Sequence, residues 1–270
     1  MGLCMQTTCA DDFVIDHVHG TTRSLTPAEI MATLMADHGM TRRTARACLT
    51  RCVENNHLSY RQQLGRTVVV PSLNRYHPLV PGVVLAPPHL PLPTDGTCCI
   101  TMKEGISFGN GTHPTTRLCA GFMMEAHERG ALWHRALDLG TGTGVLSLLA
   151  LKLGCRRVDA TEIDPIAMHD ARENSVLNGC SQYLYVYHAD EFSNAGPYEV
   201  VTANLRYPTL IALEASIHGW TAPGGDLILS GIKAGEEGRV KDAYAAHFTL
   251  QGEKSRQGWV GLHFQKSTSC

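Results

Sequence analysis

Asp138-Leu139-Gly140-Thr141-Gly142-Thr143-Gly144 is the stretch of the sequence that decides the fold. The apolar residues before it predict a buried strand, and residues 145–153 predict a helix closed by Gly154. Three glycines therefore lie on a strand-to-helix turn, where they permit positive φ angles and leave the backbone open to a ligand. The next predicted strand, 157–160, leads to Glu162, which follows Gly140 by about 20 residues, the distance at which an acid holds ribose hydroxyls in nucleotide-binding αβ folds.

The spacing of the glycines favours one class of ligand. Gly-x-Gly-x-Gly differs from the dinucleotide pattern Gly-x-Gly-x-x-Gly, which places a pyrophosphate at a helix N-terminus. Asp138 stands two residues before the first glycine, and a carboxylate there suits a ligand with a cationic end. S-adenosyl-L-methionine carries both an ammonium group and a sulfonium, so we expect it as the cofactor, with S-adenosyl-L-homocysteine as the product.

Further strands are expected at 183–187, 198–202, 226–230, 248–253 and 259–265, with helices between most of them. Asp190 and Asn204 each follow a strand, as the glycine turn and Glu162 do. Ligands of open αβ sheets bind at the carboxyl ends of the strands, so these residues should meet in one crevice, with Asp190 accepting the adenine amino group. The pattern predicts a Rossmann-like, seven-stranded class I methyltransferase domain that ends in a hairpin.

Residues 105–116 form a second informative stretch, rich in glycine and hydroxyl side chains. We expect an irregular loop that closes over the ligand and then leads into a helix reaching about His127. Thr116 either caps that helix or contacts the ligand. His113 is a candidate general base, and the alternative is a histidine with a purely structural hydrogen bond.

The N-terminal part predicts a small domain of helices and a hairpin. Helices are expected at 11–19, at 27–38 after the cap Thr26, and at 42–56, followed by strands at 58–62 and 67–70. This is the layout of a winged helix. It would act as a docking unit, a substrate lid or a homodimer contact; DNA binding is not favoured, because the net charge of the chain is −2.

Prolines crowd the segment after that domain, and few of them suit the interior of a strand or helix. We therefore predict a winged-helix-like N-terminal domain at 1–72, a proline-rich linker at 73–95 and a methyltransferase domain at 96–270.

Composition narrows the setting. The chain has 270 residues, of which 43% are hydrophobic, and no apolar run reaches the length of a membrane span. No signal peptide is recognisable, so we expect a cytoplasmic protein with no membrane partner and with its ten cysteines reduced. Cys48 and Cys52 lie one turn apart on a predicted helix, but no further ligands at zinc-like spacing are recognisable, so we predict no metal site.

Several motifs resemble those of the bacterial methyltransferases that modify large-subunit ribosomal protein eleven. They occur in the family's order over about residues 100–266, and the family's own N-terminal domain is not evident. The resemblance implies cofactor contacts at Thr116, Gly140, Glu162 and Asn204. The matching segments are Phe108-Gly109-Asn110-Gly111-Thr112-His113-Pro114-Thr115-Thr116, Leu137 to Gly144, Glu162-Ile163-Asp164-Pro165, Ala203-Asn204-Leu205 and Leu229-Ser230-Gly231-Ile232.

Three functions follow from these observations. The first is an S-adenosylmethionine-dependent methyltransferase acting on an amino group of a protein. The others are a methyltransferase for a small molecule, and a DNA-binding regulator that senses S-adenosylmethionine. We assign catalysis to His113 and Asn204, and cofactor binding to Phe108, Thr112, Thr116, Asp138, Gly140, Gly142, Gly144, Glu162, Asp190 and Asn204.

Overall fold

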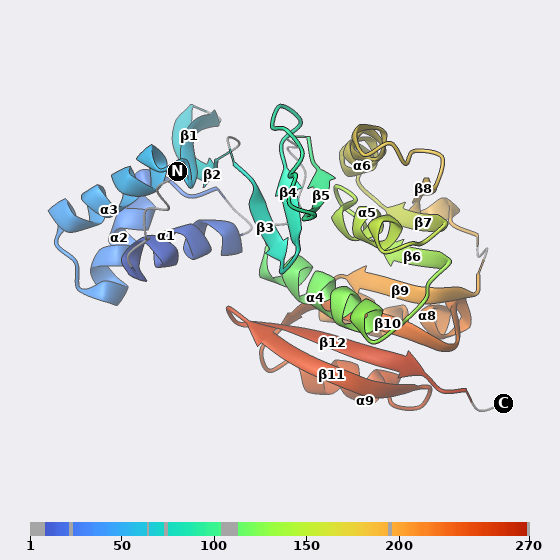
Figure 1. Cartoon of the computed structure of the whole chain (residues 1–270). Coiled ribbons are helices and arrows are strands. Elements are labelled where there is room, and N and C mark those ends of the chain that lie inside the picture. The colour runs from blue at the N-terminus through green and yellow to red at the C-terminus, as the bar shows by residue number, and fades with distance from the viewer. Residues whose placement is uncertain are drawn as a thin grey trace. The chain divides into compact units, whose positions relative to one another are not determined.

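The computed structural model describes residues 9–21, 24–63, 65–72, 75–103, 113–193 and 196–268 (Figure 1). It divides into two compact units, Met1–Tyr76 and His77–Cys270, which we call unit 1 and unit 2. The predicted ligand contacts Phe108 and Thr112 lie outside the described residues.

Unit 1 contains helices α1 (Cys9–Gly20), α2 (Pro27–His38) and α3 (Arg42–Glu54), followed by an antiparallel hairpin of β1 (Leu58–Gln63) and β2 (Arg66–Pro71). The predicted capping box is present, because the N–H of Glu29 donates to Thr26 Oγ1 and the N–H of Thr26 donates to the Glu29 carboxylate. The helices and strands of unit 1 lie at the positions expected from the sequence. In addition, Leu25 forms an isolated β-bridge with Val69 of β2.

The core of unit 1 is small and includes two thiols. Cys48 and Cys52 lie on the inner face of α3 among apolar side chains that include Leu34 and Leu49. Burial raises the pKa of Cys48 to about 12 and that of Cys52 to about 11, so both thiols keep their protons at neutral pH.

Unit 2 is built on a seven-stranded mixed sheet, as predicted, in the order β11-β12-β10-β9-β6-β7-β8. The five strands from β10 to β8 are parallel, and the last hairpin adds β12 and β11 in antiparallel pairing. The strands are β6 (Arg135–Leu139), β7 (Arg157–Glu162), β8 (Leu184–His188), β9 (Tyr198–Asn204), β10 (Thr221–Lys233), β11 (Phe248–Arg256) and β12 (Trp259–Lys266).

Helices cover both faces of this sheet. Successive residues of each strand point to opposite sides, and apolar side chains on both sides pack against helices. On β6, Ala136 packs into a core with α4 and α5, while Leu137 packs into a second core with α7, α8 and α9. Two short helices that meet at Leu213 connect β9 to β10. The helices are α4 (Pro114–Glu128), α5 (Val145–Lys152), α6 (Pro165–Leu177), α7 (Tyr207–Ala212), α8 (Glu214–Trp220) and α9 (Glu237–Tyr244), with a 3₁₀ turn, η1, at Ala189–Glu191.

Part of the proline-rich segment, expected as a linker, forms a second sheet of unit 2. It contributes β3 (His77–Val80) and β4 (Val83–Ala86), and β4 pairs in parallel with β5 (Cys98–Thr101). Pro78 is compatible with this arrangement because β3 is an edge strand, where a missing N–H is tolerated. Leu79 and Leu85 join the core beside α4, so the compact units divide after Tyr76.

Among the described residues, no helix combines the length and the apolar character needed to cross a membrane.

Candidate functional site

The glycine turn follows β6 at the carboxyl edge of the parallel strands. Gly140, Gly142 and Gly144 have φ angles of 69°, 57° and 88°, a conformation that glycine adopts readily. A side chain at Gly140 would also collide with Leu205, since its Cβ would lie 2.4 Å from Leu205 Cδ2. The turn therefore needs glycine for its backbone conformation and, at Gly140, for space.

Asp138 holds the turn from inside the protein. It is 2% exposed, and its carboxylate accepts hydrogen bonds from the hydroxyls of Thr141, Ser147 and Thr202 at 2.6–2.7 Å. Burial raises the pKa of Asp138, while the three hydroxyls act in the opposite direction. These contacts join the end of β6 to the turn, to α5 and to β9, and they support the turn. The contact of this carboxylate with the ligand remains a prediction.

Glu162 connects the glycine turn to the end of β7. Its Oε2 accepts the N–H of Gly142 at 2.9 Å, and its Oε1 accepts the N–H groups of Ile163 and Asp164 at 2.8 and 3.1 Å. A carboxylate has about four acceptor positions, so these three bonds fix the group and leave acceptor capacity on Oε2. The two motifs that the sequence separates by a helix are thus in direct contact.

Asn204 lies at the end of β9, beside the start of α4. Its Nδ2 is 3.4 Å from Oγ1 of Thr116, a long hydrogen bond between two residues that the sequence assigned to the same site. The next residue, Leu205, fits between two glycines: it touches Gly140, and its N–H donates to Ser230 O on β10. A Cβ at Gly231 would lie 2.3 Å from Leu205 O, so Gly231 makes room for the Leu205 backbone.

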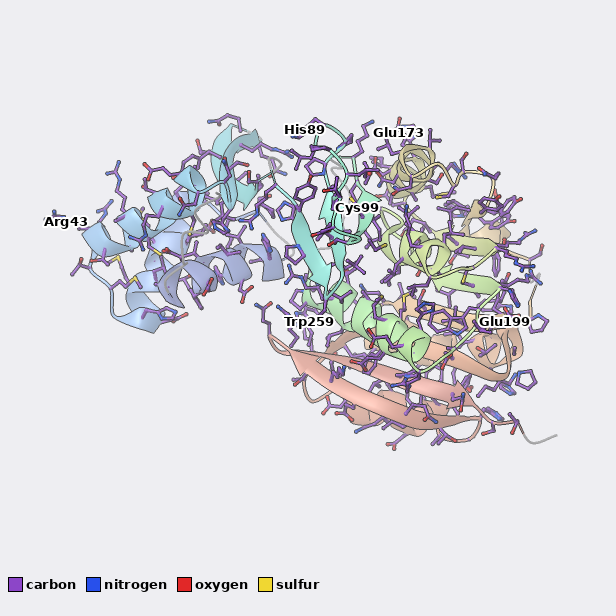
Figure 2. The ribbon with its side chains drawn as sticks, viewed as in Figure 1. Arg43, His89, Cys99, Glu173, Glu199 and Trp259 are labelled. Atoms are coloured by element: carbon purple, nitrogen blue, oxygen red, sulfur yellow. The ribbon has the colours of Figure 1, made fainter. Side chains whose placement is uncertain are left out.

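Helix α6 also contacts the glycine turn. The amide of Asn174, fully buried, donates to Thr143 O in the glycine turn at 2.9 Å and accepts the N–H of Lys103 at 2.7 Å. Lys103 also pairs through Nζ with Glu173 of α6, which Figure 2 labels. Asn174 therefore links Lys103 to the glycine turn.

His113 acts as the N-cap of α4. Its Nδ1 accepts the N–H of Thr115 at 3.3 Å, which places the ring proton on Nε2. The ring is buried and meets the indole of Trp259, labelled in Figure 2, edge to face at a centroid distance of 5.2 Å. Burial lowers the pKa of His113, so the ring stays a neutral acceptor at neutral pH. The observed contacts match the structural alternative; a role as a base remains a prediction.

Asp190 occupies the 3₁₀ turn after β8. Its side chain is 88% exposed and lies 3.7 Å from His188 Nδ1. The carboxylate is thus accessible to a ligand. The adenine contact remains a prediction.

The site residues that sequence reasoning missed are supporting ones. Asn174 and Ser147 lie inside helices and Thr202 lies inside a strand, and all three are buried polar residues. A buried polar side chain needs a partner. A polar residue inside a buried helix or strand was the available signal in the sequence, although it does not indicate which residue is the hydrogen-bond partner.

Comparisons with known proteins converge on one family. A family model described as ribosomal protein L11 methyltransferase (PrmA) matches residues 13–267. A curated ribosomal protein L11 methyltransferase of Geobacter metallireducens is 40% identical over 174 residues, which are 64% of this chain and 56% of that protein. Another, from Bordetella bronchiseptica, is 36% identical over 202 residues, which are 75% of this chain and 62% of that protein.

A solved structure agrees with these matches. The crystal structure of ribosomal protein L11 methylase from Lactobacillus delbrueckii subsp. bulgaricus superposes with a TM-score of 0.62 at 26% identity. The match covers 71% of this chain and 98% of that one.

The extent of the matches corrects one expectation. The sequence motifs suggested that the resemblance is limited to residues 100–266, whereas the family model begins at residue 13 and includes most of unit 1. Unit 1 contains no short motif comparable to the glycine turn, so its membership of the family cannot be recognised from single motifs. The chain spans 56% and 62% of the two curated relatives it matches.

Proposed function

The chain belongs to the ribosomal protein L11 methyltransferase family, and on that basis we propose that unit 2 transfers a methyl group from S-adenosylmethionine to an amino group of a protein. The observation that carries this proposal is the contact between the glycine turn and Glu162 at the carboxyl edge of the sheet. Ligands of open αβ sheets bind at this edge.

We propose a role for each part of the site. Glu162 accepts hydrogen bonds from the ribose hydroxyls, Gly140, Gly142 and Gly144 let the donor approach the backbone, and Asp138 supports the turn from below. Thr116 and Asn204 face the donor from the other side, and Asp190 accepts the adenine amino group. Phe108 and Thr112, which lie outside the described residues, remain predicted donor contacts.

The reaction is an in-line displacement. The lone pair of a neutral amine attacks the methyl carbon, the carbon–sulfur bond breaks, and its electron pair goes to the sulfur. Sulfur thereby loses its positive charge and S-adenosyl-L-homocysteine leaves. Because the sulfonium is already an activated leaving group, orientation of the two reactants is the main task of the protein. We assign that task to Asn204, and the proton of the amine leaves to solvent or to His113.

For unit 1 we propose a winged-helix-like docking module for the protein substrate. Its α3 presents Arg42, Arg43 and Arg46 to solvent, and these charges favour an acidic partner surface. Pairing of two copies through unit 1 is the alternative use of this surface. A ribosomal protein substrate would be met in the cytoplasm, which is where we place the activity.

A labelling experiment tests the proposal. The purified chain is incubated with donor carrying a labelled methyl group, together with recombinant ribosomal protein L11 or with the metabolite fraction of a cell extract. We expect label on the polypeptide, detected by intact-mass spectrometry, and expect Glu162→Gln to reduce it strongly at donor concentrations near the wild-type affinity. Label on a metabolite alone would replace the protein substrate by a small molecule.

A truncated chain that starts at residue 77 separates docking from chemistry. We expect it to keep donor binding and to lose methylation of the protein, because unit 2 contains the whole candidate site. Unchanged methylation by the truncated chain would contradict the docking role of unit 1.

A further inference from the structure

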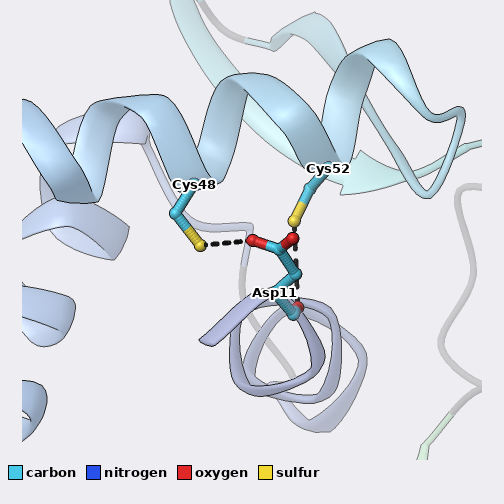
Figure 3. Close-up of side chains that lie close together, drawn as sticks. All are labelled: Asp11, Cys48 and Cys52. Carbon is cyan, nitrogen blue, oxygen red and sulfur yellow. Dashed lines mark hydrogen bonds between the residues drawn. The ribbon is translucent and has the colours of Figure 1, made fainter. Parts of the chain in front are cut away.

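Three side chains of metal-ligand type meet in the core of unit 1 (Figure 3). Asp11 projects from α1, and Cys48 and Cys52 project from one face of α3 toward it. All three are at most 4% exposed. The Cys48 thiol donates to Asp11 Oδ1 at 2.8 Å, and the Cys52 thiol is 3.8 Å from the backbone carbonyl oxygen of Asp11. One thiol thus lies at the Asp11 carboxylate and the other at the Asp11 backbone oxygen, so both sulfur atoms face the same residue of α1.

The spacing of the donor atoms fits a tetrahedral metal ion. The two sulfur atoms and a carboxylate oxygen all lie within 4.8 Å of one another. Zinc bonds of about 2.3 Å to sulfur and about 2.0 Å to oxygen separate tetrahedral ligands by roughly 3.5–3.8 Å. The sulfur–oxygen distance of 2.8 Å at Cys48 is shorter than this range, and no pair of the three atoms is more than 4.8 Å apart, so small rotations of the side chains bring the three atoms to ligand distance. Cysteines one helical turn apart supply two neighbouring ligands from a rigid element.

The charge balance also favours a divalent ion. Two thiolates and a carboxylate carry three negative charges, which a divalent cation reduces to one. Arg51 neutralises the remaining charge, because its Nε donates to Asp11 Oδ2 at 3.2 Å and its guanidinium also reaches Oδ1. With a metal on Oδ1, the Nε bond to Oδ2 persists and orients the carboxylate, as outer groups do at metal sites.

We propose that Asp11, Cys48 and Cys52 form a zinc site with three protein ligands and a solvent molecule in the fourth position. Binding breaks two S–H bonds, forms two metal–sulfur bonds and releases both protons to solvent. Sulfur ligands with a carboxylate suit zinc, whereas an all-oxygen set would suit magnesium or calcium. The ion joins α1 to α3 and stabilises the small core of unit 1. It takes no part in methyl transfer, so the site stands independently of the proposed function.

Metal uptake by the full chain tests this inference. The reduced protein is stripped with a chelator and titrated anaerobically with Co²⁺, whose thiolate complexes have a charge-transfer absorption and visible bands typical of tetrahedral cobalt. We expect one equivalent of Co²⁺ with these spectra, displacement by Zn²⁺, and a higher temperature of unfolding with Zn²⁺ than without it.

Two variants locate the ion. Cys48→Ala/Cys52→Ala should bind no cobalt with thiolate spectra. The matched control is Cys119→Ala, which removes an equally buried thiol from unit 2 and should still bind one equivalent. Circular dichroism identifies a variant that fails to fold, in which case Asp11→Asn, which should weaken uptake at least tenfold, replaces it.

Three results would overturn the proposal. The first is a folded wild-type chain that takes up no cobalt or zinc, so that the three groups only hydrogen-bond to one another. The second is undiminished uptake by folded Cys48→Ala/Cys52→Ala. The third is formation of a Cys48–Cys52 disulfide in place of metal binding in the presence of zinc.

Discussion

Two carboxylates flank the glycine turn, and their hydrogen-bond partners give them different roles. Asp138 is enclosed by three hydroxyls from its own surroundings, whereas Glu162 accepts backbone N–H groups at the edge of the sheet. The sequence could predict that both acids lie beside the turn, because their positions relative to the strands are regular. It could not predict that Ser147 and Thr202 would surround the first, because no motif pairs their hydroxyls with this acid and Thr202 is 64 residues away from it.

Replacing Asp138 tests its supporting role. We expect Asp138→Ala to lower the free energy of unfolding by roughly 3 kcal/mol, because three buried hydroxyls lose their acceptor. The control Thr202→Val removes one of those hydroxyls and should cost about 1 kcal/mol. Urea denaturation measures both. An Asp138→Ala protein of unchanged stability that no longer binds the donor would show direct contact instead.

Replacing His113 separates capping from base catalysis. Asparagine is also a good N-cap, so we expect His113→Asn to keep most of the methylation rate. His113→Ala loses the cap and its contact with Trp259, and should be less stable by about 1–2 kcal/mol. Methylation rates and thermal unfolding are measured for both variants. If His113→Asn is folded but at least a hundredfold slower, the histidine acts as the base.

Replacing Gly231 tests whether the Leu205 backbone needs the space that a glycine leaves. We expect Gly231→Ala to weaken donor binding at least tenfold, because its Cβ would displace the Leu205 backbone beside Asn204. The control Gly235→Ala has a similar φ of 94° with nothing within 4 Å, so it should show only backbone strain of about 1–2 kcal/mol. Calorimetric titration with S-adenosylhomocysteine makes the comparison. Equal affinities of the two variants would contradict this account.

Helix α6 joins parts of unit 2 that are far apart in the sequence. Asn174 holds the glycine turn and Lys103, while Asn178, one turn later, pairs with both backbone groups of Thr101 on β5. Thr101 and Lys103 are therefore both fixed to the helix that begins after Glu162.

Replacing each asparagine by alanine separates the contact of α6 with the glycine turn from its contact with β5. We expect Asn174→Ala to weaken donor binding at least fivefold, because it releases both the turn and Lys103. Asn178→Ala should lower stability by about 1–2 kcal/mol while leaving donor affinity within twofold, because its partners lie on β5. Calorimetry and urea denaturation measure the two effects. If Asn178→Ala bound the donor more weakly than Asn174→Ala, that result would argue against a role of Asn174 at the site.

The secondary-structure elements were predictable wherever the local signals agreed. The capped helices α2 and α6 and the alternating strands of the sheet appear where the sequence indicates them. The segment at 73–95 was harder, because its prolines hide β3 and β4, whose pairing with β5 depends on contacts made elsewhere in the chain. In the same way, Asp11 meets Cys48 and Cys52 only through the packing of α1 on α3.

In the whole chain, the family model extends over both units, while the candidate site lies in unit 2. The placement of Gly140, Glu162 and Asn204 at one edge of the sheet followed from the sequence, since all three lie at the ends of parallel strands. The contacts of Asp138 and His113 within the protein did not follow, because no motif specifies these side-chain contacts, and their roles toward donor and substrate remain predictions.

Calorimetric titration of the full chain with S-adenosylhomocysteine tests the central claim most directly. We predict one binding site per chain. Glu162→Gln should weaken it by roughly 10- to 100-fold, since a hydrogen bond to a charged group contributes about 1.5–3 kcal/mol. The control Asp164→Asn keeps its helix cap and should bind as the wild type does. A folded wild-type chain that shows no binding, or equal affinities for wild type and Glu162→Gln, would contradict the account.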